Sequence, residues 1–142
     1  MKELKRYFAT SELVCPHVLA RDGEKSWRQF TTDALKVLLI LRTEVLNTPL
    51  TCNVGAHTQR GLRCNLCELV KSATDGGRVY MTPHNGRGFD LSSKYDAETM
   101  RRKIEAAADK FPCPVRVEDG VTWLHIDVVD EMNGKKVYRF KA

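Results

Sequence analysis

Long apolar runs are missing from this sequence of 142 residues. No stretch approaches the roughly 20 apolar residues that a membrane-spanning helix requires, so we expect no membrane insertion. The first residues are basic but lack the apolar core and small-residue cleavage site of a secretory signal, which leads us to expect no such signal. Internal repeats, linkers and low-complexity tracts are also lacking. We therefore predict a single domain over residues 1–142, with a modest core of its own.

Blocks of like charge are absent as well. The formal net charge is +5, but the excess is spread along the chain and no five or six like charges follow one another. A basic balance is compatible with anionic partners. Without a clustered basic patch, however, we expect no dedicated nucleic-acid surface. The hydrophobic fraction of 42% and the charged fraction of 29% are ordinary for a soluble globular protein.

Cysteine is present in an odd count, at positions Cys15, Cys52, Cys64, Cys67 and Cys113. Without a secretory signal, reduced and partly buried thiols are the simplest interpretation. Cys64 and Cys67 form a C-x-x-C pair, which alone is a weak signal because a structural zinc site needs a second pair of ligands. Cys15-Pro-His17 offers that pair. Two interpretations stay open, namely apolar core fillers and a structural zinc site in a small nucleic-acid-associated protein.

Hydrophobic periodicity predicts three helices, at 32–47, 64–72 and 97–110, after an irregular lead-in over residues 1–28. Thr31 or Thr32 can cap the first helix, and Asp96 can cap the last. Leu66, Leu69 and Val70 are expected to point inward from the middle helix.

Short extended segments are predicted at 50–54, 79–81, 87–91, 115–118, 121–129 and 137–140. Asp119-Gly120 and Asn133-Gly134 are the residue pairs favoured by two-residue hairpins, so they should join the last three strands. The predicted class is α+β, with helices packed on a small, mainly antiparallel sheet.

Two of these strands combine an apolar face with a face that carries metal-ligand side chains. In the strand 121–129, His125 and Asp127 alternate with Leu124 and Ile126. In the strand 87–91, Asp90 lies opposite Phe89 and Leu91. A buried, unpaired carboxylate costs several kcal/mol, so each polar face should line a wet cleft or a metal. Together with His84, just upstream, the ligands His84, Asp90 and His125 would leave one position of a zinc ion open, as in catalytic sites.

The motifs around these residues resemble those of zinc D-Ala-D-Ala carboxypeptidases and related peptidoglycan peptidases, whose fold is shared with the hedgehog signalling domain. Thr82-Pro-His84 and Gly86-Arg-Gly-Phe-Asp90 are similar to the motif S-x-H-x-x-G-x-A-x-D, with one residue fewer between the histidine and the aspartate. Trp123-Leu-His125-Ile-Asp127 is similar to the second histidine motif, and Arg60-Gly-Leu-Arg-Cys-Asn65 to the segment Y-R-x-x-x-x-N. The start, Tyr7 to Cys15, resembles the branch found in phage lytic enzymes.

The resemblance implies a monomeric, phage- or prophage-encoded zinc peptidase that hydrolyses amide bonds of peptidoglycan stem peptides. Such a protein would lie in the host cytoplasm until its release to the cell wall, or in the virion. His84, Asp90 and His125 would bind Zn²⁺, and Arg60 would hold a substrate carboxylate or the developing oxyanion.

The general base is not assigned by the resemblance, because Thr122 stands where many members carry a glutamate. Asp127 shares the cleft face with His125, at roughly 6–7 Å along the strand, and its alternative role is to orient a ligand histidine. Glu118 is the second candidate. If the Asp119-Gly120 turn pairs Glu118 with Val121, Glu118 lies roughly 13 Å from His125, which is far for a base. A catalytically inactive cell-wall or virion binding module on the same fold is the alternative function.

Overall fold

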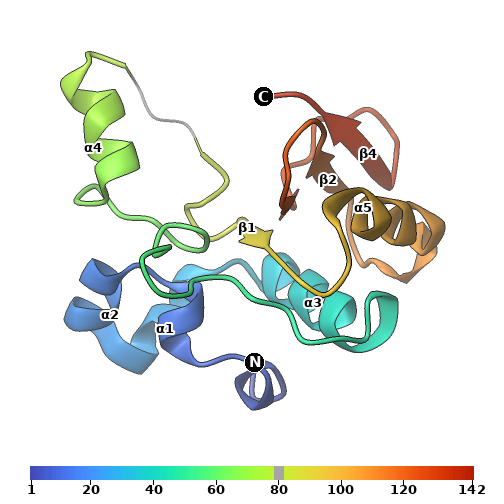
Figure 1. The fold of residues 1–142 in the computed structure, drawn as a ribbon, viewed down its shortest axis with the longest axis horizontal. Helices are drawn as coiled ribbons and strands as arrows, with labels where there is room; N and C mark the ends of the chain where they lie inside the picture. Colours follow the sequence, from blue (N-terminus) through green and yellow to red (C-terminus); the bar gives the residue numbers. More distant parts are fainter. Residues whose placement is uncertain (79–81) are drawn as a thin grey trace.

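The computed structural model describes residues 1–78 and 82–142 (Figure 1). Its sheet has four strands in the order β1-β3-β2-β4. These strands are β1 (Gly88–Leu91), β2 (Val115–Glu118), β3 (Leu124–Asp127) and β4 (Val137–Phe140). β3 pairs antiparallel with both β1 and β2, whereas β4 pairs parallel with β2. The predicted α+β class with a mainly antiparallel sheet is therefore confirmed.

Five α-helices accompany the sheet in the described residues: α1 (Thr10–Leu13), α2 (Pro16–Asp22), α3 (Thr32–Ile40), α4 (Glu68–Asp75) and α5 (Ala97–Ala106). The helix predicted at 32–47 is α3 followed by a π-helical turn at Leu41–Val45. Its cap is Thr31, whose side chain accepts a hydrogen bond from the backbone N–H of Ala34. Asp96 caps α5 in the same way, as predicted.

Several local predictions are wrong. Residues 1–28 are largely helical rather than irregular, since 3-10 turns at Leu4–Arg6 and Gly23–Gln29 flank α1 and α2. The segment 50–54 forms only isolated bridges, such as the one between Thr51 and Ser92. The extended piece predicted at 79–81 lies outside the described residues.

The middle helix also differs from its prediction. α4 begins at Glu68, four residues later than predicted, so Leu66 precedes it and is 68% exposed. Leu69 is 48% exposed, and only Val70 of the three expected residues is buried. Figure 1 shows α4 standing out from the rest of the described chain.

β2 and β3 form the predicted antiparallel pair, but not with the predicted two-residue turn at Asp119-Gly120. Arg116 pairs with Asp127 and Val117 with Ile126. The connection from β2 to β3 is therefore longer than a two-residue turn, and Glu118 does not pair with Val121. The pair Asn133-Gly134 does not join hairpin partners either, because β4 lies beside β2 and runs parallel to it.

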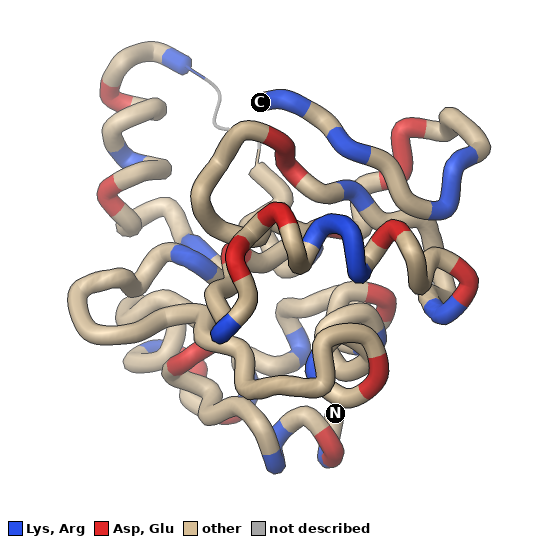
Figure 2. Tube along the Cα trace, turned by 45° about the vertical axis from the view of Figure 1, so that its right-hand side comes forward, with Lys and Arg blue, Asp and Glu red and all other residues tan. Residues whose placement is uncertain are grey.

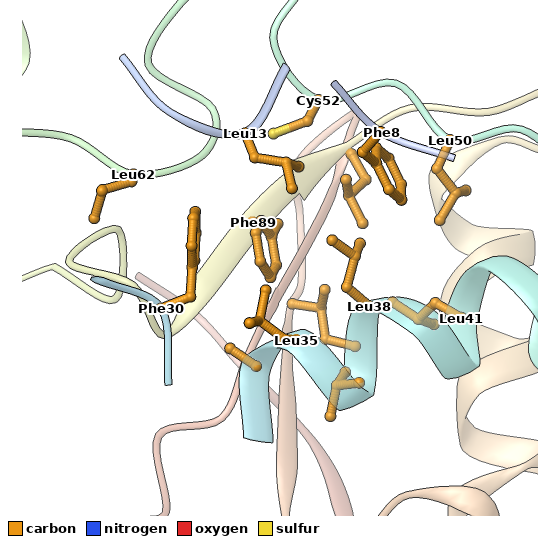
Figure 3. Packing of buried hydrophobic residues seen from close by; sticks show 14 of the residues in the cluster. Phe8, Leu13, Phe30, Leu35, Leu38, Leu41, Leu50, Cys52, Leu62 and Phe89 are labelled. Carbon is orange, nitrogen blue, oxygen red and sulfur yellow. The ribbon is translucent and has the colours of Figure 1, made fainter. Parts of the chain in front are cut away.

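The core lies between α3 and β1, where Figure 3 shows leucines of α3 facing Phe89. Phe89 stacks on Phe30 with ring centroids 5.5 Å apart. Leu38 and Leu41 are fully buried. α5 packs against β3 and β4 and also contacts the turn Leu41–Val45 that continues α3. The apolar faces of β1 and β3 are thus covered, and their polar faces remain to form a site.

Charged residues of both signs are interspersed along the trace in Figure 2. None of the helices in residues 1–78 and 82–142 combines the length and the apolarity needed to cross a bilayer.

Candidate metal centre

His84 is placed by a tight loop that presses against the residues just before α3. Gly86 has a φ of +103°, and a Cβ there would lie 2.1 Å from the carbonyl oxygen of Gln29. Its own carbonyl accepts a hydrogen bond from the backbone N–H of Thr31. Only glycine adopts this conformation in this space. The loop therefore holds the His84 ring, which is 3% exposed, in the interior.

The orientation of the His84 ring follows from its contact with Gly61. The Nδ1 atom of His84 lies 2.8 Å from the carbonyl oxygen of Gly61. Because a carbonyl oxygen only accepts hydrogen bonds, Nδ1 carries the proton. The other ring nitrogen, Nε2, lies 3.3 Å from Oδ2 of Asp90. Nε2 of His84 and Oδ2 of Asp90 thus face each other, an arrangement that a cation between them would stabilise.

Asp90 and His125 meet because β1 and β3 pair directly at these positions. Oδ1 of Asp90 lies 2.7 Å from Nδ1 of His125, and the rings of His84 and His125 are 5.4 Å apart. One ligand atom from each of the three residues lies within 4.8 Å of the others. The structure therefore brings together the three residues that the sequence singled out as metal ligands.

The protonation of this cluster reflects its burial and its hydrogen bonds. Burial raises the pKa of Asp90, but hydrogen bonds with His125 and His84 outweigh it and hold that pKa well below its usual range. Burial lowers the pKa of His125, but its hydrogen bonds with Asp127 and Asp90 outweigh it and raise the pKa to about 9. A metal that binds Nδ1 of His125 near neutral pH must therefore displace a proton.

Asp127 is fully buried and engages four donors. Its Oδ1 accepts from Nε of Arg116 at 2.8 Å and from the backbone N–H of Val129 at 3.0 Å. Its Oδ2 accepts from Nη2 of Arg116 at 2.9 Å and lies 2.8 Å from Nε2 of His125. Burial raises the pKa of Asp127, but the bonds to His125 and Arg116 outweigh it and lower the pKa. These contacts favour an orienting role, and the predicted role as base stays untested.

Glu118 lies much closer to His125 than the sequence suggested. Since Val117 pairs with Ile126, the next position of β2 falls opposite His125, where neighbouring Cα atoms are about 5 Å apart. The alternation of side chains puts Glu118 on the same face as Arg116, which contacts Asp127. Among the described residues, the Glu118 carboxylate has no hydrogen-bond or ion-pair partner.

A cavity of about 360 Å³ opens beside this cluster, and Glu118 lines it. His84, Asp90 and His125 form part of its wall, together with Trp123 and Phe140. The three candidate ligands therefore face a space that a small substrate group can enter.

Of the two arginines in the segment 60–63, only Arg63 lines the cavity. Nη1 of Arg60 reaches the carbonyl oxygen of Cys52 at 3.4 Å, and Arg60 is not among the described residues that line the cavity. Arg63 does line it, and its Nη2 lies 3.6 Å from Oδ2 of Asp90. The substrate-binding role predicted for Arg60 stays untested. The sequence did not identify Arg63 or Arg116 as residues of the site, although Arg63 lies within a recognised motif and Arg116 within a predicted strand.

A second group that could hold a metal consists of Cys15, His17, Cys64 and Cys67, whose ligand atoms also lie within 4.8 Å of one another. It contains the two pairs that the sequence suggested as a structural site.

Comparison of the chain with protein-family models, with curated proteins and with solved structures gives no match.

Proposed function

We propose that this protein is a zinc-dependent peptidase that hydrolyses amide bonds in peptidoglycan stem peptides. The observation that carries the proposal is the convergence of His84, Asp90 and His125 on one point at the wall of a cavity. Two imidazoles and one carboxylate are the ligand set of many catalytic zinc sites. Ligands at 2.0–2.2 Å from a tetrahedral ion lie about 3.3–3.6 Å apart, close to the 3.3 Å between His84 and Asp90.

A zinc ion in this position would supply a Lewis acid that polarises the scissile carbonyl and makes a water molecule more acidic. Glu118, across the strand pair from His125, is the group we assign to take the proton from that water and return it to the leaving amine. Asp127 would hold the proton on Nε2 of His125 and so orient the ring once a metal has displaced the proton on Nδ1. Arg63 offers a guanidinium for a substrate carboxylate or the developing oxyanion.

The substrate class is supported by the resemblance of the motifs around His84 and His125 to those of peptidoglycan peptidases. Stem peptides carry free carboxylates, which suit a cavity lined by Arg63 and Arg116. We propose action at the bacterial cell wall, after release from an infected host or from the virion. Both carboxypeptidase and endopeptidase cleavage fit this site.

The test combines metal analysis with digestion of defined muropeptides by the full chain. His84→Ala and His125→Ala should each lose one zinc ion and all hydrolysis. Glu118→Gln should keep the metal and lose about 10²- to 10⁴-fold in kcat. Asp119→Asn is the matched control, because it removes a neighbouring carboxylate that is not among the described residues lining the cavity. Its activity should stay near that of the wild type.

Two results would decide against this function. Hydrolysis that survives both histidine substitutions refutes the metal mechanism. Zinc bound at His84, Asp90 and His125 without hydrolysis of any muropeptide identifies the chain as a binding module instead.

A further inference from the structure

The cluster of Cys15, His17, Cys64 and Cys67 lies outside the site described above and is not used by its mechanism. The four residues come from two segments that are distant in sequence. Cys15 immediately precedes α2 and His17 lies in its first turn, while Cys67 immediately precedes α4. Their side chains nevertheless meet at one point.

The distances within the cluster are those of metal ligands. The sulfur atoms of Cys64 and Cys67 are 4.0 Å apart, and Nδ1 of His17 lies 3.7 Å from the sulfur of Cys67. Around a tetrahedral zinc ion with Zn–S of about 2.3 Å and Zn–N of about 2.05 Å, sulfurs lie about 3.8 Å apart and a nitrogen about 3.6 Å from a sulfur. A disulfide would need about 2.05 Å. All five cysteines of the chain are free thiols.

His17 separates this group from ordinary buried cysteines. Cys15 and Cys67 are buried, as apolar fillers would be, but His17 is exposed and still directs Nδ1 at the sulfur of Cys67. The backbone N–H of Cys64 also points to that sulfur, at 3.4 Å. Two donor or ligand groups thus converge on the Cys67 sulfur. Packing alone gives an exposed imidazole no reason to do so.

The backbone holds the two ligand segments together independently of the side chains. The N–H of Cys15 donates to the carbonyl of Leu62, and the N–H of Leu62 donates to the carbonyl of Leu13, at 2.9 and 2.8 Å. The ligand pairs follow directly after these bonds on both segments. The site is therefore largely preformed, which lowers the ordering cost of binding a metal.

We propose that Cys15, His17, Cys64 and Cys67 bind a structural zinc ion, distinct from the metal at His84, Asp90 and His125. Three thiolates and one imidazole prefer zinc to magnesium or calcium, and four protein ligands leave no position open for catalysis. The ion would fasten the start of α4, which otherwise stands out from the molecule (Figure 1), to α2. This proposal does not depend on any hydrolase activity.

The same ion would also brace the first cluster. Between Leu62 and Cys64, Arg63 donates its backbone N–H to the carbonyl of His84 at 2.8 Å, and Gly61 accepts from the His84 ring. A fixed segment 60–67 therefore fixes His84.

The experiment uses the full chain, purified under reducing conditions and loaded with Co²⁺ or Zn²⁺. The wild type should bind about two zinc ions and, with cobalt, show sulfur-to-cobalt charge-transfer absorption. The double variant Cys64→Ser/Cys67→Ser should lose one zinc and that absorption. His84→Ala should lose one zinc and keep the absorption, which separates a failure of this site from a failure of the first. Cys113→Ser, outside the cluster, is the matched control and should keep both metals.

Two further measurements keep the test decisive if the double variant does not fold. His17→Ala changes an exposed side chain and should weaken zinc binding about tenfold or more, since even changes beside a ligand have effects of that size. Titration of the wild type with a thiol-specific mercurial should release one of its two zinc ions. Absence of the charge-transfer absorption in the wild type, its survival in the double variant, or a Cys64–Cys67 disulfide in the reduced preparation would each overturn the proposal.

Discussion

Substituting Asp127 with asparagine tests the network that holds His125. The side chain keeps its shape, but one carboxylate oxygen becomes an NH₂ group. Each oxygen of Asp127 accepts from two donors, one of them on Arg116 in both cases. Whichever way the amide turns, two donors face the NH₂ group and lose their acceptor.

The expected loss of stability follows from this count. Hydrogen bonds to charged groups contribute about 1.5–3 kcal/mol each, and breaking a buried ion pair costs about 3–5 kcal/mol. Asp127 is fully buried, but Arg116 keeps its ion pair with Glu131 and its position 4.0 Å over the ring of Phe140. We therefore expect Asp127→Asn to lower the free energy of unfolding by about 3 kcal/mol, which is the lower end of the range for breaking a buried ion pair.

Urea denaturation of the chelator-treated protein measures this change, and competition with a zinc indicator measures metal affinity. The affinity of the His84 cluster should fall about 10- to 100-fold, because a neutral amide orients the His125 ring less firmly than the carboxylate does. Glu131→Gln is the control: it removes another carboxylate from the same Arg116, but Glu131 is 49% exposed. Its substitution should cost less than about 1 kcal/mol. Equal losses in the two variants would refute the reasoning.

Three further predictions concern other parts of the fold. In chelator the folded state holds a proton on His125 with a pKa of about 9. The stability that this proton contributes is complete below about pH 6.5 and disappears as the pH rises through 9. Urea titrations of wild type and His125→Asn should therefore differ in that window. Gly86→Ala should lower stability by about 3 kcal/mol or more, because its Cβ would lie 2.1 Å from the Gln29 carbonyl oxygen. Gly55→Ala is the comparison: its Cβ meets open space at a φ of +56°, so it should cost about 1 kcal/mol. Asp96→Ala should cost about 1 kcal/mol through loss of the α5 cap, measured by thermal unfolding.

The elements with strong local signals were predictable from the sequence. The apolar stripe and the threonine cap identified α3, and Asp96 with its following stripe identified α5. Alternation identified the apolar face of β3. The short N-terminal helices carry too few residues for a period to be recognised, since α1 has four residues and α2 seven. The parallel placement of β4 depends on long-range packing, which Asn133-Gly134 does not encode.

The residues of both clusters were identifiable as candidate ligands because few residue types bind metals and their spacing is characteristic. Their supporting residues were not. Arg116 carries no motif, and it contacts Asp127 only through the pairing of β2 with β3. The predicted position of Glu118 depended on the hairpin register. The two-residue turn predicted from the sequence put Glu118 about 13 Å from His125, whereas the longer turn in the structure puts it beside His125.

The short segment from Arg60 to Arg63 has contacts on both sides. Toward the N-terminal helices it bonds with Leu13 and Cys15, and toward the sheet it bonds with His84 and Asp90. If one ion orders this peptide on binding, the second ion no longer has to supply the free energy of that ordering, whichever ion binds first. Occupancy of the two centres should therefore be cooperative, with each zinc strengthening retention of its neighbour by the same factor.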